Sequence, residues 1–223
     1  MRILVTQIID PVGIERLQAA GFTVDVWPES TQMPREVLLE RAVGCTGLLS
    51  MLTDRVDGPI MDAGPLRVVA NHAVGCDNID LEAAQARGVV VTNTPGVLTD
   101  ATADLTMALI LSLARRLSEA ESFLRDGRFR GWRPTLLRGM DLRGATLGIV
   151  GLGRIGSAVA DRARAFGMQI VHSSRTSGLS MPALLERSDV VSLHCPLTPQ
   201  THHLIDRDAL KSMKRSALLI NTS

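Results

Sequence analysis

Short runs of Val, Ile and Leu alternate with stretches of helical, amphipathic spacing along the whole chain. In the first half, the runs predict strands and the stretches between them predict helices. The strands are expected at residues 2–8, 23–26, 47–52, 67–70 and 89–92, and the helices at 12–20, 35–43 and 81–87. Strands that are apolar on both faces and separated by helices are typical of a parallel sheet covered on both sides.

The pattern changes at residue 99. Residues 99–125 carry apolar side chains at helical spacing and predict one long helix, capped by Thr99 or Asp100. An Arg- and Gly-rich segment without periodicity follows. A second alternating series predicts strands at 146–150, 169–173, 190–194 and 217–221, and helices at 155–166, 181–186 and 207–213. We therefore predict an α/β fold of two doubly wound parallel-sheet domains, residues 1–97 and 98–223.

Composition and charge narrow the functional classes. Apolar residues make up 45% of the 223 residues, charged residues 21%, and the net charge is +1, which is typical of a soluble globular protein. The absence of a basic block and the scarcity of aromatic residues disfavour a nucleic-acid partner. No apolar helical run is long enough to span a membrane, and Asp10 interrupts the amino terminus too early for a signal peptide. Cys45, Cys76 and Cys195 show no CxxC spacing, so we expect no disulfide, no metal site and a cytoplasmic location.

The sharpest local motif is GLGRIG at residues 151–156. It follows an apolar strand, opens a helix and is succeeded by a second strand at the spacing of a βαβ unit. Gly151 permits a tight turn, Gly153 lets the backbone approach a pyrophosphate, and Gly156 allows the helix to pack closely on the strand. A glycine-rich turn without a ligand is the alternative, but the context favours a dinucleotide site.

The residues after the second strand of this unit indicate which dinucleotide is bound. A carboxylate at that position binds the ribose 2′-hydroxyl of NAD(H), whereas this chain has Ser173, Ser174, Arg175 and Thr176. Arg175 can form a forked, charged pair with a 2′-phosphate, and the hydroxyl groups can add hydrogen bonds. We therefore expect NADP(H) to be preferred and NAD(H) to remain possible; the alternative is a solvated loop arginine.

Several motifs along nearly the whole chain resemble the D-2-hydroxyacid dehydrogenase family, close to its glyoxylate/hydroxypyruvate reductase branch. They are AVGCDNID at 73–80, GVVVTNTPGVLTDATADLTMALILSLARRL at 88–117, LRGATLGIVGLGRIG at 142–156, SDVVSLHCPLTPQT at 188–201 and MKRSALLINTS at 213–223. The resemblance implies a flavodoxin-like substrate-binding domain, a Rossmann NAD(P)-binding domain, and a homodimer formed through the helix that starts near Thr99. It also implies hydride exchange between a nicotinamide and a small 2-keto or 2-hydroxy acid.

The resemblance also implies individual roles. For the substrate, Val74 and Gly75 would offer backbone amides to its carboxylate, and Leu52 would line its pocket. For the cofactor, the pyrophosphate would be held by Leu152, Gly153, Arg154 and Ile155, and the phosphate on the adenosine ribose by Ser174, Arg175 and Thr176. The adenine would lie beside Cys195 and Pro196. The nicotinamide would lie near Thr102, and the ribose attached to the nicotinamide beside Asn221 and Thr222. Four of these residues have simpler interpretations: Gly75 as a turn glycine, Leu52 as core, Cys195 as a buried apolar residue and Thr102 as an ordinary first-turn residue.

Reduction of a keto acid also needs a cation for the ketone and carboxylate, a general acid, and a carboxylate that orients it. The family supplies an Arg, a Glu and a His for these roles, and none has a counterpart before Ser223. His72, at the end of a strand, is the most plausible substitute, but no histidine has an obvious acidic partner. We therefore expect the catalytic residues beyond Ser223, in a longer enzyme, and no keto-acid reductase activity in a chain that ends there.

Two other functions remain open at this stage. A protein of this fold could present a dinucleotide-dependent surface to a partner without catalysis. A dehydrogenase of the same family could also act on a phosphorylated hydroxy acid, which would require additional cations near the pocket.

Overall fold

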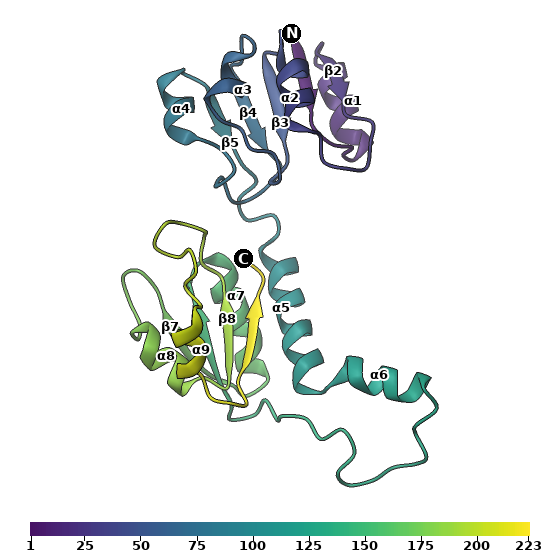
Figure 1. Cartoon of the computed structure of the whole chain (residues 1–223), viewed down its shortest axis with the longest axis vertical. Coiled ribbons are helices and arrows are strands. Elements are labelled where there is room, and N and C mark those ends of the chain that lie inside the picture. Colours follow the sequence, from purple (N-terminus) through teal and green to yellow (C-terminus); the bar gives the residue numbers. More distant parts are fainter. The chain divides into compact units, whose positions relative to one another are not determined.

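Each half of the chain forms its own parallel sheet in the computed structural model, which describes residues 1–223 (Figure 1). The two compact units comprise Met1–Gly96 and Val97–Ser223. The predicted α/β class with parallel sheets is confirmed. No helix combines the length and the apolar character that crossing a membrane requires.

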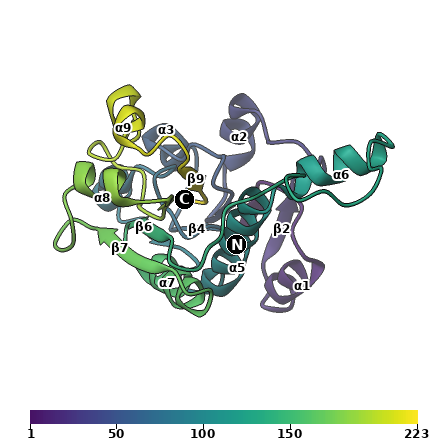
Figure 2. The same ribbon diagram turned by 90° about the horizontal axis from the view of Figure 1, so that it is seen from below.

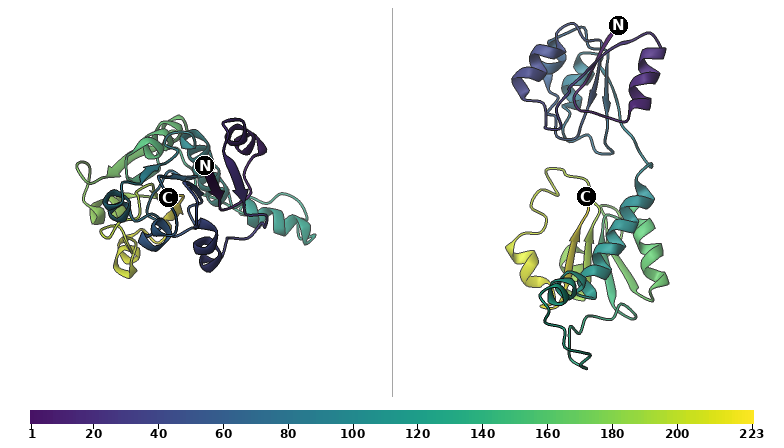
Figure 3. Two further views of the ribbon diagram at one scale, coloured as in Figure 1. Left: turned by 90° about the horizontal axis from the view of Figure 1, so that it is seen from above. Right: turned by 90° about the vertical axis from the view of Figure 1, so that its right-hand side faces the viewer.

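The first unit is a five-stranded sheet in the order β2-β1-β3-β4-β5, with every neighbouring pair parallel. Helix α1 lies on one face and α2, α3 and α4 on the other (Figure 3). The elements are β1 (Arg2–Val5), α1 (Pro11–Ala19), β2 (Thr23–Val26), α2 (Arg35–Ala42), β3 (Gly47–Ser50), α3 (Gly58–Asp62), β4 (Val68–Asn71), α4 (Leu81–Ala86) and β5 (Val90–Thr92). The sequence pattern missed α3, because five residues are too few to show a helical period.

The core of this unit lies between the sheet and helices α2–α4. Leu4, Leu48 and Val69, which project from β1, β3 and β4, are at most 2% exposed there. The α1 face is less covered, because an apolar hollow of about 360 Å³ opens over β1, β3 and β4, lined by Ile3 and Leu49 among others.

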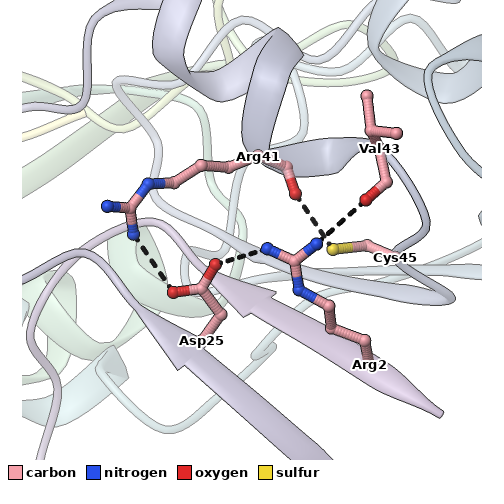
Figure 4. Close-up of polar contacts among 5 residues, drawn as sticks. All are labelled: Arg2, Asp25, Arg41, Val43 and Cys45. Carbon is pink, nitrogen blue, oxygen red and sulfur yellow. Dashed lines mark hydrogen bonds and ion pairs between the residues drawn. The ribbon is translucent and has the colours of Figure 1, made fainter.

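A polar cluster joins β1, β2 and α2 (Figure 4). The carboxylate of Asp25 accepts hydrogen bonds from Arg2 at 2.7 Å and from Arg41 at 3.1 Å, and Arg2 also donates to the carbonyl of Val43 at 2.9 Å. The thiol of Cys45 donates to the carbonyl of Arg41 at 3.2 Å, and burial raises its pKa. These contacts fasten the edge strand β2 and leave Cys45 a buried thiol.

The second unit is a four-stranded parallel sheet in the order β7-β6-β8-β9. Its strands β7, β6 and β9 are labelled in Figure 2. Helices α5 and α7 cover one face, and α8 and α9 cover the other. The elements are α5 (Thr99–Ala114), α6 (Leu117–Arg125), β6 (Thr146–Val150), α7 (Arg154–Ala165), β7 (Gln169–Ser173), α8 (Met181–Arg187), β8 (Val190–Leu193), α9 (Arg207–Ser212) and β9 (Leu218–Asn221).

The prediction of one helix over residues 99–125 is wrong, because the chain bends between α5 and α6. Arg116 adopts a left-handed conformation with φ of 55°. The carbonyl of Ala114 accepts the amide of Met140 at 2.8 Å and so does not continue the helical ladder. A contact with a distant segment therefore ends α5, although the apolar periodicity continues.

The predicted cap of this helix is also wrong. Leu98 occupies the cap position, and neither Thr99 nor Asp100 makes a capping hydrogen bond. Asp100 instead accepts from Arg162 of α7 at 2.9 Å, and Asp104 accepts from the same guanidinium at 2.6 Å. These pairs hold α5 against α7 beside the sheet.

Candidate functional site

The turn after β6 is shaped by close backbone contacts that require glycine. Gly151 has φ of 94°, and a Cβ there would lie 2.7 Å from the carbonyl oxygen of His194. Its amide donates to the carbonyl of Ser173 at 2.9 Å. A Cβ on Gly156 would lie 2.3 Å from the carbonyl oxygen of Gly151. The turn is therefore packed between the ends of β7 and β8, and α7 starts directly against it.

The outer side of this turn suits an anion. No heavy atom other than its chain neighbours comes within 4 Å of the position that a Cβ on Gly153 would take. The amides of residues 152–156 donate no hydrogen bond within the protein. Free amides at a helix amino terminus, together with its dipole, bind phosphate groups. The residues present therefore fit the pyrophosphate of a dinucleotide.

The turn also lies where ligands bind in open α/β sheets. The chain passes from β6 to β7 on one side and then crosses to β8 on the other side of β6. Ligands bind at the carboxyl ends of the strands where the order reverses in this way. Gly151 follows β6 and His194 follows β8, so both flank this point.

A tight hairpin follows β7 and presents Arg175 and Thr176 at its tip. The amide of Ser174 donates to the carbonyl of Ser177 at 2.9 Å, and the Ser174 hydroxyl bonds to Ser177 as well. Gly178, with φ of 98°, allows the return to His172. Ser174 is thus used within the turn, while the exposed side chains of Arg175 and Thr176 make no hydrogen bond.

In the first unit, the three predicted substrate residues lie on loops at the carboxyl ends of strands. Leu52, after β3, is 66% exposed, so it is not a core residue. Val74 and Gly75 lie on the loop after β4, and both are exposed. Gly75 does not have the positive φ that would make it a turn glycine; a Cβ there would meet Oδ1 of Asp77 at 2.8 Å.

Comparison with known proteins identifies the family. Residues 107–223 match the model of the NAD binding domain of D-isomer specific 2-hydroxyacid dehydrogenases. The chain is 45% identical over 235 residues to a glyoxylate reductase of Korarchaeum cryptofilum, covering 100% of this chain and 70% of the relative. The chain belongs to the D-isomer specific 2-hydroxyacid dehydrogenase family.

Further relatives share this architecture. A glyoxylate reductase of Thermococcus kodakarensis is 47% identical, covering 99% of this chain and 71% of the relative. The crystal structure of TT0316 protein from Thermus thermophilus matches with a TM-score of 0.95 and 50% identity, covering 100% of this chain and 74% of that one. A glyoxylate reductase structure from Paecilomyes thermophila matches with a TM-score of 0.87 and 30% identity, covering 100% of this chain and 73% of that one. A nicotinamide dinucleotide is therefore the cofactor class of this dehydrogenase.

A chain of hydrogen bonds runs from α5 to the end of β8 in the dehydrogenase. The Thr106 hydroxyl donates to the carbonyl of Thr102 at 2.8 Å and lies 3.0 Å from the Thr222 hydroxyl. Thr222 lies 3.4 Å from Nδ1 of His194, whose Nε2 lies 2.8 Å from the Ser192 hydroxyl. One assignment satisfies all groups: Thr222 donates to Thr106, Nδ1 of His194 donates to Thr222, and Ser192 donates to Nε2. This assignment requires a neutral imidazole.

The pKa of His194 agrees with that requirement. Burial lowers it from 6.5 to about 4, because a charged imidazole loses hydration that no nearby carboxylate replaces. Protonation of Nε2 would also remove the acceptor that the buried Ser192 hydroxyl uses. His194 is therefore a neutral structural group beside the turn at residues 151–156.

We expect His194 to make stability depend on pH. As pH falls from about 6.5 to about 4, the His194 imidazole binds a proton in the unfolded chain but not in the folded chain. The free energy of unfolding therefore falls. Between pH 7 and pH 4.5, the free energy of unfolding should therefore fall by about 2 kcal/mol less in His194→Asn than in the parent. Urea unfolding at the two pH values measures this, with His203→Asn on the surface as the matched control. An equal decrease in parent and His194→Asn would contradict the assignment.

The remaining predicted cofactor residues differ in their surroundings. Cys195 packs against the apolar cluster under α8, and burial raises its pKa, which agrees with the apolar interpretation. Pro196 is exposed, and its carbonyl accepts from Thr201 at 2.6 Å. The carboxamide oxygen of Asn221 accepts from the amide of Ser223 at 3.1 Å. Thr222 is turned toward Thr106 and His194, so its hydroxyl is already engaged.

No histidine among residues 1–223 is paired with a carboxylate. His172 and His194 contact hydroxyl groups, and the rings of His202 and His203 stack at 3.8 Å. His72 is exposed, and its imidazole makes no hydrogen bond. The structure therefore assembles no imidazole–carboxylate pair among residues 1–223, and the expectation that an Arg, a Glu and a His beyond Ser223 carry out the catalysis stays a prediction. Likewise, no cluster of three or more His, Cys, Asp or Glu residues is placed to hold a metal.

Sequence reasoning missed three polar residues near the predicted sites. Thr106 is 0% exposed and bonds to Thr222 across the unit, while Asn71, 2% exposed, and Asn93 both bond to the loop that carries Val74. The sequence feature that could have identified these residues is a polar side chain where an apolar one is expected, at the carboxyl end of a strand or on the buried face of a helix.

Proposed function

We propose that this dehydrogenase reduces a small 2-keto acid, glyoxylate or hydroxypyruvate, to the D-2-hydroxy acid and uses NADPH in preference to NADH. The observation that carries this proposal is the anion-binding turn at residues 151–156 beside a hairpin that presents Arg175 and no acid. The relatives named glyoxylate reductase support the choice of substrate.

The charge around the β7 hairpin supports NADPH. No Asp or Glu occurs between Asp161 and Glu186, so no side chain of the hairpin would repel a 2′-phosphate. Arg175 makes no ion pair, and its guanidinium offers five donors to phosphate oxygens. Thr176 can add a hydroxyl donor from the same tip. The Ser174 hydroxyl holds the turn by bonding to Ser177, so Ser174 would contribute by shaping the hairpin rather than by contacting the phosphate.

Other residues of the chain have proposed roles in binding. The amides of Leu152 to Ile155 would hold the pyrophosphate, and Thr102 and Asn221 would lie toward the nicotinamide end. When bound, the nicotinamide supplies the hydride that reduces the carbonyl carbon. The backbone amides of Val74 and Gly75 would hold the carboxylate of the keto acid, and Leu52 would contact its carbon chain.

An exposed apolar surface supports a homodimer. Leu105, Leu109 and Leu113 follow one another at four-residue spacing on α5 and are 54%, 37% and 50% exposed. Trp132, in the segment after α6, is 81% exposed. A continuous apolar stripe of this kind is typical of a protein–protein interface, and we propose that a second copy of the chain covers it.

A turnover and binding assay tests the proposed function. The purified full-length protein is given glyoxylate, hydroxypyruvate or pyruvate with either NADPH or NADH, and cofactor affinity is measured separately by fluorescence titration. We expect the highest turnover for NADPH with glyoxylate or hydroxypyruvate, and tighter binding of NADPH than NADH. Binding without turnover of any keto acid would favour the dinucleotide-sensing alternative, and equal values for the two cofactors would contradict the role of Arg175.

A further inference from the structure

Three consecutive carbonyl groups on the loop after β4 are each held by a donor. The carbonyl of Ala73 accepts the amide of Thr94 at 3.0 Å. The carbonyl of Val74 accepts Nδ2 of Asn93 at 2.8 Å, and that of Gly75 accepts Nδ2 of Asn71 at 2.8 Å. All three peptide planes are therefore fixed from the same side of the loop, the side of β4 and β5.

The orientation of these carbonyls determines the orientation of the amides. In a trans peptide the N–H points opposite to the preceding C=O, and all peptide bonds of the chain are trans. The amides of Val74, Gly75 and Cys76 therefore face away from the donors. None of these amides donates a hydrogen bond within the protein. Asp77, the carboxylate beside Gly75, accepts none of them.

A buried network keeps the donors in place. Asn71 is 2% exposed, and its Oδ1 accepts from the Ser50 hydroxyl at 3.0 Å and from Asn78 at 3.2 Å. Asn78 also donates to the carbonyls of Met51 and Asp54, both at 3.0 Å. The amide flip of Asn71 is thus determined, with Nδ2 directed at Gly75. Asn93 reaches the loop from the end of β5, next to Asn71 in the sheet.

We propose that Asn93 and Asn71 are positioning residues that direct the amides of Gly75 and Cys76 outward, beside the Val74 amide that the Thr94 contact directs, as a cradle for the substrate carboxylate. The inference rests on the proposed function, and it adds Cys76 as a third donor. Backbone amides without a partner inside the protein are groups with which proteins bind anions such as a carboxylate. Without the two asparagine donors, the Val74 and Gly75 carbonyls would be free to rotate toward the ligand, and their oxygens would repel it.

The test uses the full chain with oxalate, a dianion that resembles glyoxylate, as the probe. Asn93 is exposed, so Asn93→Leu removes the donor without adding a charge, at similar side-chain size and without disturbing the core. Thr92→Ala, at the preceding exposed position of β5, is the matched control. Amide NMR spectra of each protein are recorded during titration with oxalate, and NADPH affinity and Tm are measured in parallel.

We expect oxalate to shift the amide signals of Val74, Gly75 and Cys76 in the parent and in Thr92→Ala. In Asn93→Leu the dissociation constant for oxalate should rise about tenfold, with an unchanged NADPH affinity because the proposed cofactor residues lie in the other unit. Oxalate affinity equal to that of the parent, or binding that leaves these three amide signals unmoved, would overturn the proposal. Failure of the parent to bind oxalate overturns it too, whereas failure of the parent to bind NADPH overturns the proposed function.

Discussion

Gly153→Ala is expected to abolish most of the dinucleotide affinity and to leave the fold intact. A Cβ at this position meets no protein atom within 4 Å, and the backbone, with φ of −87°, is open to any residue. The stability change should therefore stay within about 1 kcal/mol. The added methyl group would occupy the space of the pyrophosphate, and we expect NADPH affinity to fall on the order of a hundredfold, by loss of charge-assisted hydrogen bonds. Thermal unfolding and fluorescence titration measure the two effects.

Gly156→Ala provides the contrast, because its Cβ would lie 2.3 Å from the carbonyl oxygen of Gly151. This contact is with backbone, so the helix or the turn must move, at a cost of about 1–3 kcal/mol. We expect this variant to lose both stability and NADPH affinity. Undiminished NADPH binding by Gly153→Ala would place the pyrophosphate elsewhere.

Arg175→Ala is expected to weaken NADPH binding about tenfold to a hundredfold and to change NADH binding little, because a charged hydrogen bond contributes about 1.5–3 kcal/mol. The residue is exposed and unpaired at the hairpin tip, so its removal costs no packing. Titration of the variant with both cofactors gives the two affinities.

Arg187→Ala is the matched control for Arg175→Ala. Arg187 is exposed in the last turn of α8, away from the turn at residues 151–156. Its removal changes the net charge by the same amount as the removal of Arg175. We expect this variant to bind both cofactors like the parent. A loss of NADPH affinity shared equally by NADH in Arg175→Ala would place this arginine away from the 2′-phosphate.

The success of the sequence pattern depended on how local each feature is. The strands and most helices were predicted within a few residues, because buried parallel strands need continuous Val and Ile runs such as 146–150 and 190–194. The turn at residues 151–156 could also be predicted from the sequence, because Gly151 and Gly156 lie only a few residues apart. Helix α3 was missed because its five residues carry no period.

The end of α5 was not readable, because the sequence on both sides of Arg116 keeps a helical pattern. Only the folded chain brings Met140 to the carbonyl of Ala114. The same holds for Leu52, whose apolar side chain is compatible with core or surface. Its 66% exposure follows from the turn that Met51 and Asp54 form after β3.

The order of residues along the chain was enough to predict two α/β units, a glycine turn typical of a phosphate site, the lack of a carboxylate after the second strand of the second unit, and a loop with adjacent Val74 and Gly75. Each of these depends on neighbours along the chain. Only the folded chain places Asn71 and Asn93 so that both bond to the loop with Val74 and Gly75, because β4 pairs with β5 in the register that aligns Ala70 with Thr92. Folding likewise brings Thr106 of α5 together with Thr222, which follows β9, and His194, which follows β8. Hydrogen bonds between distant segments have no period in the sequence, so they become visible only when the strands and helices that carry them are packed.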